Sequence, residues 1–162
     1  MTSYAAITDD GTVRLERAFP VPVDQLWAYL TTPDGLRRWI ADGQIGPDRA
    51  RLRFADNGSL IDGAVIAWEP PSLVEFAWDG GPTQAHGSRV RFELSADGAS
   101  SRLVLTHSRT ASQAAPDFAA GWHRHLDTLD YLTRGTQPPA ARPAWQDLQQ
   151  HYLALASEGT GG

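Results

Sequence analysis

The five histidines are the side chains of this sequence with the widest chemical range, because histidine can act as acid, base or metal ligand near neutral pH. They are His86, His107, His123, His125 and His151. His123 and His125 are two positions apart in a predicted helix, so their rings point in different directions and cannot hold one metal ion. No spacing among the five matches a known ligand set. We therefore predict no metal site and no cofactor.

His107 stands at the end of a predicted strand. Strand alternation places it on the same face as Leu103 and Leu105, which is the face that a helix should cover. One interpretation is a half-buried ring that hydrogen-bonds a backbone group or the long helix. The other is a polar group at the mouth of a cavity. We favour the first, because a buried polar side chain is usually satisfied by hydrogen bonds.

Other catalytic groups are poorly represented. The sequence has no cysteine and no lysine, which excludes thiolate, Schiff-base and lysine-dependent P-loop chemistry. No serine stands in a G-x-S-x-G elbow, and the Asp9-Asp10 pair falls where solvation is the ordinary explanation. We predict no catalytic residue. Arg49, Arg51 and Arg53 share one face of a strand; a solvated outer face is the simplest interpretation, and a rim for an anionic partner or ligand carboxylate is the alternative.

Length and composition indicate one ordinary globular domain, with 162 residues, 41% hydrophobic and 20% charged. The net charge of −5 argues against nucleic acid as a partner. No apolar run reaches the roughly 18 residues of a membrane span. The N-terminus has neither the basic region nor the apolar core of a signal peptide. We expect a cytoplasmic protein.

The longest predicted helix, residues 117–134, organises the other elements. Phe118, Trp122, Leu126 and Leu129 fall on one face of its roughly five turns. The opposite face is mostly polar and carries His123, Arg124, Asp127, Thr128 and Asp130. The apolar face needs a broad surface to cover it, and only a sheet built from the preceding residues is broad enough.

The preceding residues predict that sheet. The strands are expected at residues 11–19, 49–55, 63–69, 72–78, 88–95 and 101–108, with two short helices at 21–32 and 33–39. Residues 41–47 are expected to form a loop, and residues 1–10 a loose or weak edge extension. Strands in series followed by a helix indicate an α+β fold with an antiparallel sheet and its helix on one face.

The C-terminal tail is a separate question. Residues 136–142 form a Pro-rich connector, and residues 143–157 predict a helix with Trp145, Leu148, Tyr152 and Leu155 on one stripe. Such a stripe should dock on its own domain or on a partner subunit, which would make a homodimer through this helix. We divide the chain into an N-terminal extension (1–11), a domain (12–135) and this tail (136–162).

An ordered set of residues within 12–135 is distinctive. It comprises residues 13–17, Pro22, Leu26, Trp27, residues 30–33, Leu36, Trp39, Gly63, residues 69–71, 76–78 and 103–107, Gly121, Trp122, His125, Leu126 and Leu129. In this order the set resembles the activator of heat-shock protein 90 ATPase homologue family, within the START-like (SRPBCC) superfamily. The resemblance implies a helix-grip, Bet v-like fold: a curved antiparallel sheet around a long C-terminal helix, two small helices at one end, and usually a cavity between sheet and helix.

Our first functional hypothesis is a non-enzymatic domain that holds a lipophilic or aromatic small molecule between the sheet and the long helix. Affinity would come from apolar burial, about 25 cal/mol per Å². The candidate ligand-binding residues are Trp39, Phe76, Trp78, Phe92, Leu105, His107, Trp122 and Leu126. Solid core packing of the same aromatic residues is the competing interpretation.

Two alternatives come from the resemblance. A stress-related co-chaperone would bind a chaperone or another protein, although the family's activator role depends on surfaces and an additional domain that this chain does not show. Some START-like domains are instead cyclases or hydrolases of polyketide-like substrates. That activity would need His107 or a buried carboxylate as a general base within hydrogen-bond reach of the substrate.

Overall fold

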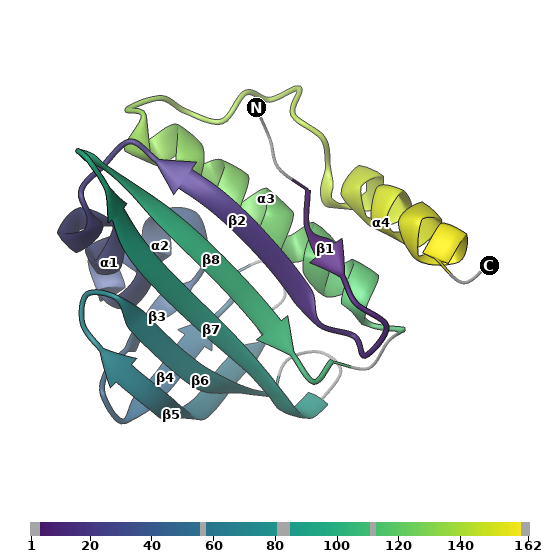
Figure 1. The fold of residues 1–162 in the computed structure, drawn as a ribbon, viewed down its shortest axis with the longest axis horizontal. Helices are drawn as coiled ribbons and strands as arrows, with labels where there is room; N and C mark the ends of the chain where they lie inside the picture. The colour runs from purple at the N-terminus through teal and green to yellow at the C-terminus, as the bar shows by residue number, and fades with distance from the viewer. Residues whose placement is uncertain (1–3, 56–57, 81–84, 111–112, 160–162) are drawn as a thin grey trace.

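The structure, a computed structural model, describes residues 4–55, 58–80, 85–110 and 113–159. Its elements, in chain order, are β1 (Ala6–Ile7), β2 (Val13–Phe19), α1 (Val23–Thr31), α2 (Pro33–Trp39), β3 (Asp42–Ile45), β4 (Arg49–Arg53), β5 (Leu60–Glu69), β6 (Leu73–Gly80), β7 (Ala85–Asp97), β8 (Ser100–Ser108), α3 (Ala115–Thr133) and α4 (Trp145–Gly159). In this part of the chain one eight-stranded antiparallel sheet, ordered β1-β2-β8-β7-β6-β5-β4-β3, curves around α3 (Figure 1). The predicted α+β helix-grip fold is confirmed.

The concave face of the sheet is set by strand alternation. On β2 the inward positions begin with Val13 and Leu15, which are the register partners of His107 and Leu105 on β8. Leu105 is in turn opposite Phe92 on β7. These side chains are all buried, so one continuous apolar layer faces α3, and His107 sits within that layer.

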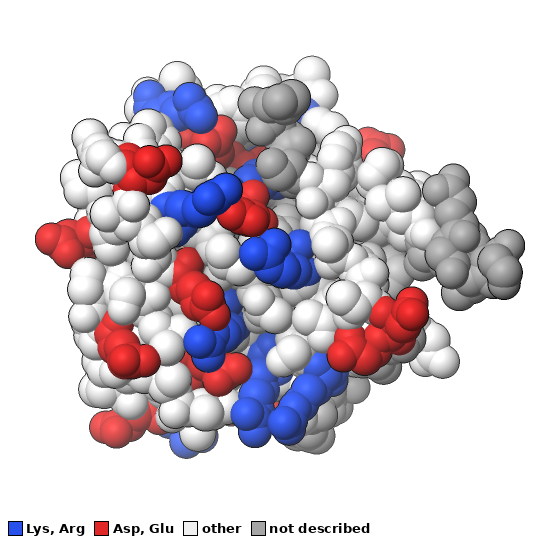
Figure 2. All heavy atoms as spheres, in the orientation of Figure 1, with Lys and Arg blue, Asp and Glu red and all other residues white. Residues whose placement is uncertain are grey.

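The convex face carries charges of both signs. Glu16 on β2 accepts from Arg14, at 3.3 Å, and from Arg102 on the neighbouring β8, at 2.5 Å. Arg91 on β7 pairs in the same way with Glu75 and Glu93. Figure 2 shows acidic and basic side chains interleaved over this surface. Such exposed pairs contribute little to stability, but they leave the face solvated and locally neutral.

The expected loop at residues 41–47 is wrong in part, because β3 pairs there with β4. Alternation of apolar and polar residues does not reveal the strand Asp42–Ile45, because Ile45 is its single apolar side chain and its single buried one. Gly43 shows why the pairing is possible. A β-carbon at that position would lie 1.8 Å from the carbonyl oxygen of Arg51, so only glycine permits the approach.

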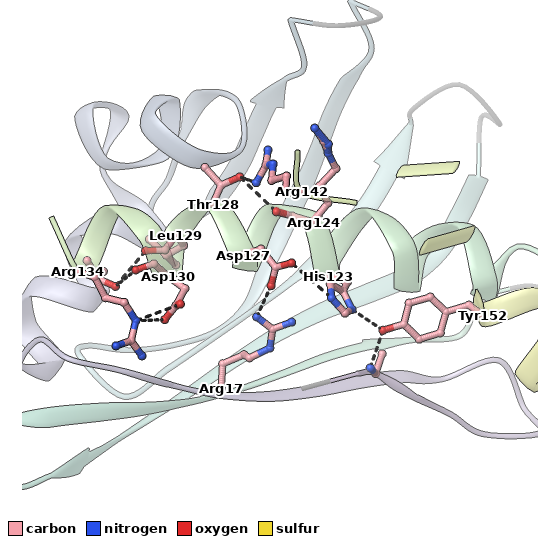
Figure 3. Close-up of polar contacts among 12 residues, drawn as sticks. Arg17, His123, Arg124, Asp127, Thr128, Leu129, Asp130, Arg134, Arg142 and Tyr152 are labelled. Atoms are coloured by element: carbon pink, nitrogen blue, oxygen red, sulfur yellow. Dashed lines mark hydrogen bonds and ion pairs between the residues drawn. The ribbon is translucent and has the colours of Figure 1, made fainter. Parts of the chain in front are cut away.

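The polar face of α3 lies opposite the apolar one, as predicted, but it is not all exposed, because His123 is buried with only 2% of its surface accessible. Oδ1 of Asp127 forms an ion pair with the guanidinium of Arg17 on β2, at 2.8 Å. Its Oδ2 lies 3.4 Å from Nε2 of His123. Burial opposes ionisation of Asp127, but hydrogen bonds from His123 and Arg17 outweigh it and hold the pKa of that carboxyl below its usual value. Figure 3 shows Asp127 between its two partners.

Helix α4 covers this second face of α3 (Figure 1). Leu148 and Tyr152 are buried, whereas Leu155, predicted on the same stripe, is 42% exposed. The Tyr152 hydroxyl accepts the Ala5 N–H at 2.7 Å and lies 2.8 Å from Nδ1 of His123. Burial raises the pKa of Tyr152 to about 12, so the hydroxyl stays protonated. With Nε2–H of His123 directed at the Asp127 carboxylate, Nδ1 accepts a hydrogen bond from the Tyr152 hydroxyl. Of the two predicted docking modes, the tail adopts the one on its own domain.

Replacing Tyr152 with phenylalanine tests this contact. The change removes one oxygen, leaves the ring in place, and strands the buried Ala5 N–H and the His123 nitrogen. We expect a loss of about 1–3 kcal/mol in the free energy of unfolding, measured by urea denaturation. Leu155→Ala on the exposed side of α4 should change stability by less than about 0.5 kcal/mol. Equal effects of the two substitutions would contradict the docking.

Candidate functional site

Aromatic rings fill the space between α3 and the sheet. Trp122 on α3 packs edge to face against Trp78 on β6, with ring centroids 5.3 Å apart, and against Phe92 on β7 at 6.1 Å. Phe76 lies 6.2 Å from Trp78 and 5.9 Å from Phe92. We call these four residues the aromatic seam. All four are buried, so the predicted meeting of aromatic side chains is present as packed core.

His107 is the polar member of this core. The Trp122 indole N–H donates to Nδ1 of His107 at 3.0 Å, so the neutral ring must carry its proton on Nε2. Nε2 lies 3.1 Å from the hydroxyl oxygen of Ser88 and donates to it. Ser88 then donates to the carbonyl oxygen of Trp78 at 3.3 Å. These three hydrogen bonds give the Trp122, His107 and Ser88 donors an acceptor each, and they connect α3 to β8, β7 and β6.

The surroundings of His107 match the first interpretation in one respect and differ in another. The ring does bond the long helix, but it is fully buried rather than half-buried. Burial lowers the pKa of His107 to about 3, so the ring stays neutral at physiological pH. Both nitrogens are engaged, and the ring is a weak base. A general-base role for His107 therefore has no support in this geometry.

A small pocket opens beside the aromatic seam, under the N-terminal half of α3. Its volume is about 70 Å³. It is lined by Ile40, Phe54, Trp78, Asp117, Phe118, Gly121, Trp122 and His125. Of the eight predicted ligand-binding residues, Trp78 and Trp122 are thus brought to the pocket wall. The other six are buried in the surrounding core, namely Trp39, Phe76, Phe92, Leu105, His107 and Leu126.

Two polar residues of the pocket lie outside the predicted set. Nδ1 of His125 donates to the Trp39 carbonyl oxygen at 3.2 Å, which fixes the orientation of the ring. The Asp117 carboxylate accepts from Gln149 on α4 at 2.7 Å. Their position beside Phe118 and Leu126 on the apolar face of the helix was the available signal. For Phe54 the signal was alternation in the strand predicted at residues 49–55, which places it on the face opposite Arg51 and Arg53.

The described residues hold no group of three histidine, aspartate or glutamate side chains placed to bind one metal ion. His123 and His125 point apart, as predicted: one ring meets Tyr152 and the other meets Trp39. Among the helices of the described segments, none is long and apolar enough to cross a membrane.

The buried neutral His107 predicts an acid-sensitive fold. Its pKa falls from 6.5 to about 3 on folding, so between these values the unfolded chain binds a proton that the folded chain does not. The contribution of neutral His107 to the free energy of unfolding should be fully present above pH 6.5 and should be lost as the pH falls toward 3. Over this range the equilibrium constant for unfolding should rise up to about tenfold per pH unit. Urea titrations at several pH values measure this slope.

A non-titrating variant isolates the contribution of His107. His107→Gln should be less stable at pH 7, yet its stability should depend less on pH than that of the wild type. His151→Gln, at an exposed position on α4, should keep the full wild-type pH dependence. The same slope in the His107→Gln variant and the wild type would show that this ring is not the source.

Comparison with known proteins places these features in a family. Residues 20–133 match the sequence profile of the family described as Activator of Hsp90 ATPase homolog 1-like protein. No curated protein matches the sequence. The fold matches CalU16 from Micromonospora echinospora, which is 23% identical over 94% of each chain, with a TM-score of 0.72.

Two further solved structures are similar. DynU16, from the dynemicin biosynthetic locus, is 25% identical over 80% of this chain and 49% of its own, with a TM-score of 0.67. The protein encoded by BPP1335 of Bordetella parapertussis is 30% identical over 94% of this chain and 93% of its own, with a TM-score of 0.72. Because the family profile matches residues 20–133, which is more than half of the sequence, the chain belongs to the Activator of Hsp90 ATPase homolog 1-like family.

Proposed function

We propose that this domain binds a small, lipophilic aromatic molecule in the pocket beneath α3. The observation that carries the proposal is the pocket wall, in which Phe54, Trp78, Phe118 and Trp122 meet at one opening. Asp117 and His125 add the few polar groups that usually orient a ligand in an otherwise apolar site. This arrangement suits a flat ring better than a polar or strongly charged ligand.

The size of the pocket limits the ligand. Its 70 Å³ is less than half of the roughly 150 Å³ of an apolar cavity that holds benzene. A ring can therefore enter only partly unless the wall moves. Phe54 and Phe118 are half-buried, in contrast to the buried Trp78 and Trp122, so they are the parts of the wall that can swing outward. The rest of the ligand would remain at the surface beside α2.

The two alternatives have less support. An enzyme acting through His107 would need that ring to reach the substrate, but both of its nitrogens are already bonded within the core. A chaperone-directed role rests on the family description alone. The location of DynU16 in a biosynthetic locus is compatible with a small-molecule ligand.

Filling the pocket tests the proposal. Ile40 lines it and is half-buried, so Ile40→Phe should occupy the space that a ligand needs. Ile66→Phe makes the same change at an exposed position on β5. We expect toluene and naphthalene to shift the amide NMR signals of the pocket residues in a saturable way. Affinity should fall at least tenfold in Ile40→Phe and stay within twofold of wild type in Ile66→Phe.

Two results would contradict the proposal. One is an absence of saturable shifts at the pocket residues with either compound. The other is an affinity that is unchanged by Ile40→Phe in a variant whose NMR spectrum shows that it is folded.

A further inference from the structure

We propose that a second site, on the outside of the sheet, binds a small organic oxyanion. It is a groove of about 530 Å³ between α2 and the outer face of β3 and β4, within the size range of small-molecule sites. It is lined by Pro33, Arg37, Asp42, Gly43, Gln44, Arg51, Arg53 and Leu60. We call it the arginine groove. It shares no lining residue with the pocket under α3, and the proposal stands apart from the function proposed above.

The arginine groove follows from the register of the sheet. Arg51 and Arg53 are alternate residues of β4, so both point to the outer face. Their partners on β3 are Gln44 opposite Arg51 and Asp42 opposite Arg53. Arg37 comes from the last turn of α2, on the other side of the groove. Three guanidinium groups from two elements therefore line one hollow.

These three cations differ in how far they are already paired. Arg37 forms an ion pair with Asp34 in its own helix. Arg51 lies 3.5 Å from Asp62, whose closer partner is Arg49 at 2.5 Å. Arg53 has no ion pair within the part of the chain that the structure describes. An incoming anion would displace no partner from Arg53 and only a long contact from Arg51.

The chemistry of the lining defines the ligand. A guanidinium presents two parallel N–H donors, which match the two oxygens of a carboxylate or phosphate. The Gln44 amide adds a neutral donor, and Pro33 and Leu60 offer apolar contact for a carbon body. Asp42 opposes an anion, and Asp34 and Asp62 already pair with Arg37 and Arg51, so Arg53 is the cation of the groove that is most available to a ligand. One oxyanion group would pair with Arg53, and a second group on the same small molecule would compete for Arg51, whose contact with Asp62 is long.

The overall charge argues for a small ligand rather than a nucleic acid. The chain has a net charge of −5, and its convex face carries both signs in alternation (Figure 2). A long polyanion would extend beyond the groove, where the surface has no excess of positive charge and the net charge of the chain is unfavourable, whereas a small anion would contact only the arginines of the groove.

Isothermal titration with pyrophosphate and with citrate tests the proposal, since one probe carries phosphate oxygens and the other carboxylates. At low salt we expect saturable binding of at least one. Arg53→Gln should weaken it at least fivefold. Arg38→Gln, which removes the same charge from α2 at a residue that lines a different hollow, should stay within twofold of wild type. Asp42→Asn should tighten binding by removing the opposing charge.

Each outcome decides the question. Binding of pyrophosphate alone would assign the groove to phosphorylated compounds, binding of citrate alone to carboxylates, and both results support an oxyanion site. Failure of both probes to bind would overturn it. So would equal weakening by Arg38→Gln and Arg53→Gln, because that would reduce the effect to general charge. Toluene binding to the pocket under α3 should be unchanged in all these variants, which keeps the two proposals separable.

Discussion

Burying the indole of Trp122 is the constraint on which the rest of this structure depends. An indole N–H removed from water must find an acceptor, and the only atom that accepts from it is Nδ1 of His107, among the described residues. His107 must then remain neutral, and its Nε2–H donates a hydrogen bond to the Ser88 hydroxyl. One buried ring thus fixes the tautomer of a second and the position of α3 over three strands.

A second polar chain holds the other side of α3. It runs from Arg17 through Asp127 and His123 to Tyr152, and ends at the backbone of Ala5 (Figure 3). This chain joins the N-terminal segment, β2, α3 and α4, so the two ends of the sequence meet on one helix. Every buried side-chain polar atom in the described segments has a hydrogen-bond partner, which is the condition under which such networks are tolerated. The long helix is therefore covered on both faces, with apolar packing on one and paired charges on the other.

The order of elements could be predicted because their signals are local. Alternation identified β6, β7 and β8, and helical periodicity placed Trp122, Leu126 and Leu129 on the buried face of α3. The burial of His123 could not be predicted. It depends on Arg17, which is distant in the sequence, and on the docking of α4, so no single segment contains the information. β3 was missed for the opposite reason, since its pairing depends on the absence of a side chain at Gly43.

In the candidate site, too, some features could be predicted from local sequence and others depend on contacts between distant segments. Aromatic composition predicted that indole rings would meet between helix and sheet, and Trp78 and Trp122 do meet there. Whether the rings enclose a cavity or fill the space depends on contacts of a few ångströms, which periodicity does not encode. The rings form a packed aromatic seam with a small pocket at its edge. Six of the eight predicted residues are buried in the core and do not line the pocket. Phe54, just after β4, and Asp117, in the first turn of α3, line the same pocket because the end of one element lies near the start of the other.

Hydrogen exchange at the Trp122 indole N–H tests the central claim most directly, because that proton reports its own burial and bonding in an ¹⁵N NMR spectrum. We predict that it exchanges only when the whole domain unfolds, far more slowly than the indole proton of the half-buried Trp145, and that its rate follows the free energy of unfolding. Exchange at Trp122 as fast as at Trp145 would show that the helix is not locked to the sheet and would contradict this account.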